Sequence, residues 1–172
     1  MTIYHLPVPA TSRMSPRLLL LRLETIYAQI TAIAGPFALL FLRLPVALTF
    51  WYSGRTKVEG WNIFSLQASQ PYLFEHEFGL PFPVLSAHLT AIAEHILPVL
   101  VILGLFTRFG ALGMLVMTTV IQLFVFPDAW WNAHMWWAVV LFAVVALGPG
   151  PISVDHGIAR WAQSRPATGH RA

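Results

Sequence analysis

The sequence of 172 residues contains no cysteine and few charged residues. Without cysteine, this chain forms no disulfide, thiolate metal site, iron–sulfur cluster or thiol redox relay of its own. Asp, Glu, Lys and Arg together make up 10% of the residues, whereas an average soluble domain contains about 25%. Hydrophobic residues make up 57% of the chain. This composition excludes an ordinary soluble domain and predicts an integral membrane protein.

Four apolar runs are long enough to cross a bilayer as helices, which takes about 20 residues each. They lie at about residues 36–53, 83–106, 109–126 and 133–149. The preceding residues 16–34 are also apolar but include three charged side chains (Arg17, Arg22 and Glu24). We therefore expect residues 16–34 to form an amphipathic helix on the membrane surface rather than a fifth span. A break at Gly35 and Pro36 should separate it from the first span.

The positions of the basic residues predict how these spans are oriented. Seven arginines fall on one side of the predicted membrane: Arg13, Arg17, Arg22, Arg108, Arg160, Arg165 and Arg171. Only Arg55 and Lys57 fall on the other side, so the positive-inside rule places both termini in the cytoplasm. The high pI of 9.8 then reflects membrane topology, and we expect the lipid bilayer rather than nucleic acid as a partner.

The predicted fold is thus an all-α membrane protein, a bundle of four transmembrane helices with an N-terminal amphipathic helix. We expect a single membrane domain over residues 16–160. The ends, 1–15 and 161–172, are expected to be flexible because they are short and polar.

Two charged residues interrupt predicted spans near their middles, Arg43 in the first and Glu94 in the second. A charge at the bilayer centre costs at least about 2.5–3.5 kcal/mol, so it usually marks a function or a buried pair. Each lies about eleven residues from the outer end of its span, which at about 1.5 Å per residue gives both a depth of about 16 Å. We therefore expect an Arg43–Glu94 ion pair. The pair would either only lock two helices together or also form the floor of a ligand cavity. Pro98, four residues after Glu94, predicts a kink in the helix beside the pair.

Further polar side chains are predicted closer to the outer surface. His88 and His95 are seven residues apart and share one face of the second span. Gln122 lies in the outer half of the third span, and His134 begins the fourth. We expect a polar funnel that opens to the outside. His88, His95 and His134 are candidate ligands of copper or zinc, and the alternative is that they make hydrogen bonds between helices.

A loop of nearly thirty residues, 54–82, separates the first two spans. Its later part, 73–78, alternates aromatic and acidic residues. Loops of this length inside compact domains are typically lids or binding elements. The alternative is a short amphipathic helix that rests on the outer membrane surface.

Motifs in several places resemble the DoxX family of small bacterial four-helix membrane proteins, over residues from about 38 to 160. They are Arg43 followed by Gly54 and Lys57, Glu94 in the second span, Gly104–Arg108 at the inner turn, Gly148–Asp155 after the last span and the loop Leu73–Pro81. That loop is similar to the one in DoxX proteins found beside metal-responsive peptide genes. The resemblance implies a multi-pass protein of the bacterial inner membrane and a link to the membrane subunit of thiosulfate:quinone oxidoreductase. It also implies protein partners, because other members look like partners of superoxide dismutase and sulfurtransferase in redox assemblies.

The residues and the resemblance support two functional hypotheses. The first is a membrane component of a redox or metal and oxidative-stress response, with a quinone or another lipophilic ligand held between the helices. The second is a non-enzymatic binder, transporter or assembly factor for a small ligand or a metal ion such as copper. The sequence has no dinucleotide-binding fingerprint and no nucleophile elbow, so enzymatic activity and oligomeric state stay open. The candidate ligand-binding residues are Arg43, Lys57, His88, Glu94, His95, Gln122 and His134.

Overall fold

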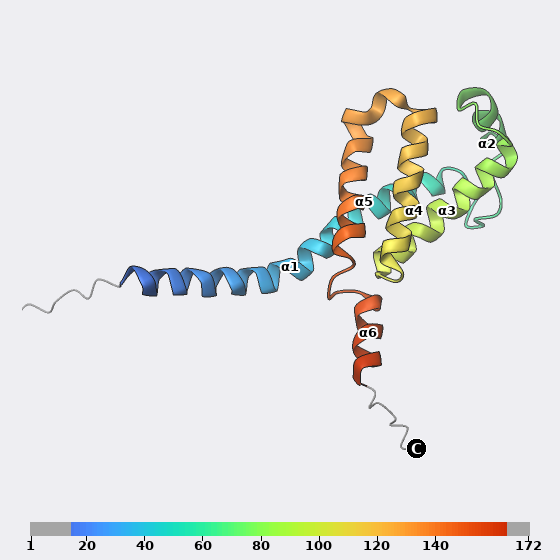
Figure 1. The fold of residues 1–172 in the computed structure, drawn as a ribbon. Coiled ribbons are helices and arrows are strands. Elements are labelled where there is room, and N and C mark those ends of the chain that lie inside the picture. Colours follow the sequence, from blue (N-terminus) through green and yellow to red (C-terminus); the bar gives the residue numbers. More distant parts are fainter. Residues whose placement is uncertain (1–14, 165–172) are drawn as a thin grey trace, which may run out of the picture. The chain divides into compact units, whose positions relative to one another are not determined.

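The computed structural model describes residues 15–164 (Figure 1). Over these residues the chain is helical apart from its loops and one isolated antiparallel bridge between Val58 and Leu66. The helices are α1 (Pro16–Arg55), α2 (Gln70–Tyr72), α3 (Pro83–Leu103), α4 (Thr107–Val120), α5 (Met135–Leu147) and α6 (Val154–Ser164). Three π-helical segments and one 3-10 turn adjoin them: η1 (Leu73–Glu77), η2 (Ile121–Val125), η4 (Trp130–His134) and the 3-10 turn η3 (Pro127–Ala129).

Within the described residues, four helical stretches are long and apolar enough to cross a membrane. They are Pro16–Arg55, Pro83–Leu103, Thr107–Val125 and Pro127–Leu147. The predictions of an all-α fold and of four spans are thus confirmed. The fourth span begins at Pro127 rather than at residue 133, because η3 and η4 add helical turns before α5.

The predicted flexible ends lie largely outside the described residues, as do Arg13, Arg165 and Arg171 of the orientation argument. Where the described part does reach them, α6 continues to Ser164 and so extends four residues into the predicted C-terminal tail. The cytoplasmic location of both termini stays a prediction.

The predicted break at Gly35 and Pro36 is wrong, because α1 continues through both residues. A proline inside a helix removes one backbone hydrogen bond, and membrane helices tolerate this since the neighbouring turns keep theirs. The chain nevertheless divides here into two compact units, Met1–Gly35 and Pro36–Ala172. In the first unit, residues 16–34 are helical and nearly all exposed. α1 has 40 residues, about twice what one crossing needs, so its first half still requires a separate place such as the membrane surface.

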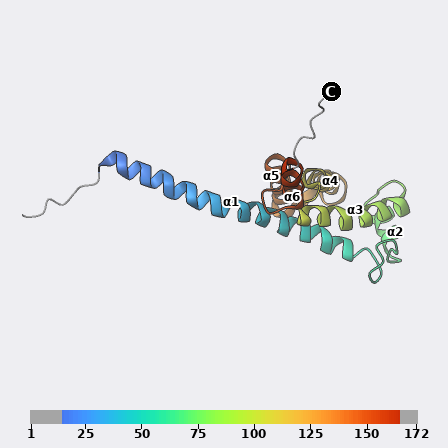
Figure 2. The ribbon, with the colours of Figure 1, turned by 90° about the horizontal axis from the view of Figure 1, so that it is seen from below.

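In the second unit, the later half of α1 and α3 lie side by side and run antiparallel (Figure 2). Two close approaches fix their register. A Cβ atom at Gly54 would lie 2.9 Å from His95 Nδ1 and 3.0 Å from Glu94 Cβ. A Cβ atom at Gly104 would clash with Arg43 Nη1. Glycine at these positions therefore lets the two membrane helices pack closely.

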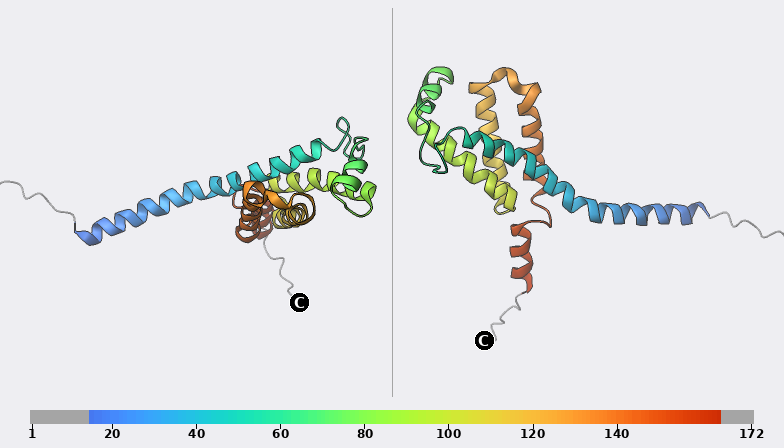
Figure 3. Two further views of the ribbon diagram at one scale, coloured as in Figure 1. Left: turned by 90° about the horizontal axis from the view of Figure 1, so that it is seen from above. Right: turned by 180° about the vertical axis from the view of Figure 1, so that it is seen from behind.

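α3 and α4 are joined by a short turn in which Gly104 and Phe106 adopt positive φ angles of 70° and 45°. This turn lies slightly earlier than the gap between the predicted spans 83–106 and 109–126, because Thr107 already begins α4. From the turn, α3 and α4 diverge, whereas α4 and α5 form an antiparallel hairpin (Figures 1 and 3). We call the Gly104–Phe106 end of this unit the turn end, and the end that carries residues 54–82 the loop end.

The core of the second unit is formed by α1, α3, α4 and α5. Its buried apolar residues are Val46, Ala47, Phe50, Val101, Ala111, Met114, Leu141 and Val144. Toward the turn end, α3 and α4 are in tight contact, since Cβ atoms at Gly110 and Gly113 would meet Val101 and Leu97 at 3.0 and 2.8 Å. Small residues thus close the packing at the turn end, and the divergence of α3 and α4 leaves space at the loop end.

Candidate functional site

A cavity of about 570 Å³ lies in the second unit toward the loop end. Its walls come from α1, α3, α4, η2 and α5, and from the 54–82 loop. Most of the lining is apolar, and its polar side chains are Thr49, Ser53, Lys57, Thr90, Glu94 and His134. A cavity of this size, mainly apolar with a few convergent polar groups, is typical of a site for a small lipophilic molecule.

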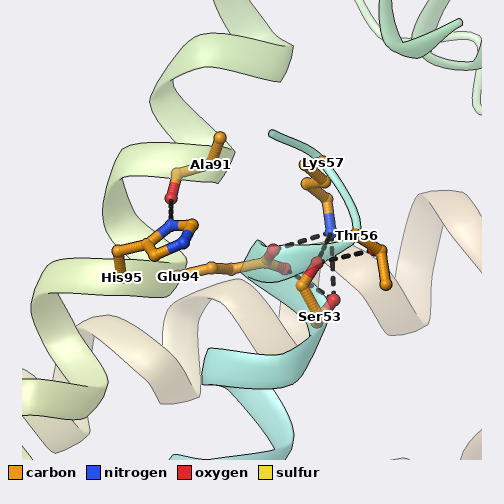
Figure 4. Close-up of polar contacts among 6 residues, drawn as sticks. All are labelled: Ser53, Thr56, Lys57, Ala91, Glu94 and His95. Carbon is orange, nitrogen blue, oxygen red and sulfur yellow. Dashed lines mark hydrogen bonds and ion pairs between the residues drawn. The ribbon is translucent and has the colours of Figure 1, made fainter. Parts of the chain in front are cut away.

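Lys57 and Glu94 form an ion pair at the wall of the cavity (Figure 4). Lys57 Nζ lies 2.6 Å from Glu94 Oε2, and the two side chains are 13% and 2% exposed. The Ser53 hydroxyl donates to Glu94 Oε1 at 3.2 Å. Lys57 Nζ donates to the Ser53 hydroxyl and carbonyl oxygens at 3.0 and 3.3 Å. All three ammonium hydrogens therefore have acceptors within the protein.

The predicted Arg43–Glu94 ion pair is wrong. Glu94, in the middle of α3, pairs with Lys57, whereas Arg43 lies beside Gly104, just after the C-terminal end of α3. Glu94 and Gly104 are ten residues apart, which is about 15 Å along a helix. The depth estimate requires the C-terminal end of the first span and the N-terminal end of the second to lie at the same depth. In the structure α3 starts beyond the end of α1, so Glu94 stands opposite Ser53.

Arg43 is fully buried at the turn end, where its Nη2 donates to the Ile152 carbonyl at 2.6 Å. Nearby, the Asp155 carboxylate accepts from the backbone N–H groups of Phe106 and Thr107 at 2.9 and 3.1 Å. It also accepts from the Thr107 hydroxyl at 3.0 Å. We call these five residues the turn clasp, because they tie the segment after the last span to the turn between α3 and α4. Arg43 does not line the cavity.

Asp155 lies after the last span, and opposing effects act on its carboxyl group. Burial alone would raise the pKa of Asp155. The hydrogen bonds from Thr107 and Phe106, together with the positive charge of Arg43, outweigh burial and hold the pKa below its usual value. The carboxylate is therefore the form that stabilises the turn clasp.

His134 and Gln122 are neighbours at the loop end. His134 Nδ1 lies 2.7 Å from Gln122 Oε1, and Gln122 Nε2 donates to the Pro127 carbonyl at 2.6 Å. The imidazole is buried and its ring centre lies 5.0 Å from that of Trp137. His134 and Trp137 line the cavity, but Gln122 does not.

His88 and His95 are not part of the cavity lining. His88 Nδ1 lies 2.9 Å from the Val84 carbonyl of its own helix, and His95 Nδ1 lies 2.7 Å from that of Ala91. Nowhere in residues 15–164 do three His, Asp or Glu side chains gather as a metal site would need. The copper or zinc site predicted from His88, His95 and His134 is therefore not assembled.

The 54–82 loop covers the loop end of the cavity with aromatic side chains. Phe74, in η1, is buried and lines the cavity together with Phe78 and Leu80. The Phe78 ring contacts Phe74 and Phe126 edge to face, with centroids 5.3 and 5.9 Å apart. Phe126 lies between η2 and η3, so the loop reaches across to the α4–α5 connection. The loop therefore has the position that a lid requires. Its side chains at the cavity are apolar, unlike the polar funnel that the sequence predicted.

The side of the cavity between α3 and α4 is different. Leu89 of α3 and Val116 and Val120 of α4 line the cavity, and they are 58%, 55% and 38% exposed. These side chains belong to two membrane-spanning helices that diverge from the turn. An apolar, partly exposed rim on spanning helices favours access from the lipid rather than from water.

Residues 38–127 match the model of the DoxX family. An uncharacterised protein of Haemophilus influenzae is 28% identical over 134 residues, which cover 72% of this chain and 84% of that protein. No solved structure matches the chain. The matched family region includes Arg43, Lys57 and Glu94 and ends at Pro127, before His134 and Asp155.

Proposed function

The chain belongs to the DoxX family of membrane proteins, and we propose that it binds an uncharged lipophilic ligand, such as a quinone, in the cavity beside Lys57 and Glu94. In this proposal it is a multi-pass protein of the bacterial inner membrane and a component of a redox or stress-response system. Both termini lie in the cytoplasm, as the bias in arginine positions suggests.

The observation that carries the proposal is a buried ion pair in the wall of an otherwise apolar cavity. A charged pair in a membrane helix bundle is costly, and it typically marks a ligand or ion pathway. Since Lys57 and Glu94 compensate each other's charge, neither a metal ion nor an anion would find an unbalanced opposite charge there. A neutral ring compound would instead fill the apolar volume and contact the pair with its polar groups. Of the two functional hypotheses, the cavity therefore favours the lipophilic ligand over the metal ion.

The lipid-facing rim supports the same ligand class. Leu89, Val116 and Val120 offer an apolar path between α3 and α4, and the aromatic cover of Phe74 and Phe78 closes the loop end. A ligand dissolved in the bilayer would enter sideways without crossing a polar barrier. In this view Arg43 has a structural role in the turn clasp, and Lys57, Glu94 and His134 contact the ligand.

The test is direct binding of a decyl-substituted benzoquinone to the purified protein in lipid nanodiscs, measured by equilibrium partition. The wild type should bind it saturably. Ala93→Phe places a ring in the cavity and should lower the affinity at least about tenfold. Ala146→Phe is the matched control, because Ala146 lies on α5 with its side chain exposed and outside the cavity. Absence of saturable binding to the wild type, or equal binding by both variants, would contradict the proposal.

A further inference from the structure

We infer that the cavity selects ligands that donate a hydroxyl hydrogen to His134, so that a dihydroxy ring binds more tightly than the corresponding dicarbonyl ring. This inference deepens the proposed function and rests on it. It concerns which oxidation state of a ring compound the site prefers.

The tautomer of His134 is fixed by Gln122. The amide nitrogen of Gln122 donates to the Pro127 carbonyl at 2.6 Å. Turning the amide round would place its oxygen against that carbonyl, with two acceptors in contact, so the amide has one orientation. Its oxygen therefore faces His134 Nδ1 at 2.7 Å, and Nδ1 must carry the hydrogen. In the neutral ring, Nε2 is then an acceptor with a free lone pair.

The imidazole atom left to contact a ligand in the cavity is Nε2, the hydrogen-bond acceptor. Nδ1 is directed to Gln122, which does not line the cavity, whereas His134 itself does. The ring of Trp137, 5.0 Å away between centroids, packs beside the imidazole and also lines the cavity. Gln122 and His134 both lie in π-helical segments, η2 and η4, and such segments are frequent at functional sites.

Two other polar side chains of the cavity, Lys57 and Thr49, add little for a carbonyl oxygen. Lys57 already donates to Glu94 and to two oxygens of Ser53, so no ammonium hydrogen is left over. The Thr49 hydroxyl donates to the Pro45 carbonyl at 2.9 Å. The Thr90 hydroxyl lines the cavity and can donate or accept, so it favours neither form. A ligand that offers a hydrogen therefore gains a partner at His134, and one that has only acceptors does not.

The experiment compares three ligands that share one ring and one decyl chain: the benzoquinone, its reduced quinol and the quinol dimethyl ether. The dimethyl ether keeps the oxygens and removes both hydrogens, so it separates hydrogen donation from ring shape. Partition into nanodiscs that contain the wild-type protein is measured without oxygen. The quinol should bind about tenfold more tightly than the quinone and the ether, as expected for one well-placed hydrogen bond.

Two variants assign the preference to His134. His134→Phe keeps a ring beside Trp137 and removes the Nε2 acceptor, so the quinol should lose most of its advantage over the quinone. Gln122 lies outside the cavity. Gln122→Met frees the tautomer, so Nε2 can also carry the hydrogen, and the preference for the quinol over the quinone should shrink or disappear. His156→Phe is the matched control, because His156 is exposed on α6. Its affinities for all three ligands should equal those of the wild type. Gln122→Met also provides the answer if His134→Phe does not fold.

The outcomes separate the two proposals. If no ring compound binds, the proposed function fails. If the quinone binds as tightly as the quinol, or if the ether binds as tightly, the site binds ring compounds but the preference for a donor is refuted. A quinol preference that survives unchanged in Gln122→Met also refutes the assignment to the tautomer held by Gln122.

Discussion

Removing one member of the Lys57–Glu94 ion pair should destabilise the protein by different amounts, depending on which charge remains. Lys57→Met leaves the Glu94 carboxylate 2% exposed, with one hydrogen bond from the Ser53 hydroxyl. Loss of a partner from a buried pair costs about 3–5 kcal/mol, and this variant should lie within that range. Glu94→Gln leaves the Lys57 ammonium 13% exposed and still bonded to two oxygens of Ser53. Its cost should be lower, about 2 kcal/mol.

The double variant isolates the interaction itself. Lys57→Met combined with Glu94→Gln leaves no uncompensated charge, so its destabilisation should be smaller than the sum of the single changes by about 2 kcal/mol. The free energy of unfolding is measured in mixed micelles by titration with a denaturing detergent and followed by tryptophan fluorescence. Folding of each variant is checked by circular dichroism.

Arg43 supplies the matched control for this cycle. It is also buried and charged, but it contacts Ile152 rather than Glu94. Arg43→Met combined with Glu94→Gln should therefore be additive within about 0.5 kcal/mol. Additive effects for Lys57 and Glu94, together with coupling between Arg43 and Glu94, would refute the arrangement of charges described above.

Two further predictions concern the turn clasp and the close approach of α1 to α3. Asp155 has a pKa held below its usual value in the folded protein. The stabilisation by its carboxylate is therefore present above the unfolded pKa of about 3.9 and is lost as the pH falls through the folded pKa. Asp155→Asn should remove this acid-dependent part of the unfolding free energy, and a pH profile equal to that of the wild type would contradict the prediction. Gly54→Ala should lower the melting temperature by several degrees, because its Cβ would meet His95 and Glu94. Gly157→Ala on α6 is the control and should leave the melting temperature unchanged, because its Cβ meets nothing within 4 Å. Equal melting temperatures for the two variants would contradict the close packing of α1 on α3.

The sequence was sufficient for the membrane class, the four spans and the family, because these depend on local composition. A long apolar run can be recognised without knowing how the helices are shifted relative to one another, and all four observed spans end within three residues of the predicted ends. The continuous path of α1 through Gly35 and Pro36 was not predictable from these residues alone. Proline occurs both where a helix ends and within membrane helices that tolerate the lost hydrogen bond, so Pro36 does not distinguish the two cases.

The partner of Glu94 was missed because pairing between helices depends on their relative shift. Counting from both predicted outer ends made Arg43 and Glu94 level, and the shift of α3 relative to α1 moved Glu94 to Ser53 instead. Lys57 is a candidate only through the family resemblance, and the structure brings it to Glu94. The sequence marks residues 73–78 as part of a candidate binding loop, but only the packing shows that Phe74 and Phe78 line the cavity.

The separation of Arg43 from Glu94 suggests why one helix bundle carries two buried charges. At the turn end, Arg43 and Asp155 belong to a set of hydrogen bonds that joins the turn between α3 and α4 to the segment after α5. Such bonds favour a fixed spacing where Gly110 and Gly113 already bring the helices together. At the loop end the helices diverge, and the pair formed by Glu94 lines an open volume instead. A rigid turn end and an open loop end are complementary, because a cavity in a lipid bilayer keeps its shape only if the helices around it are held together elsewhere.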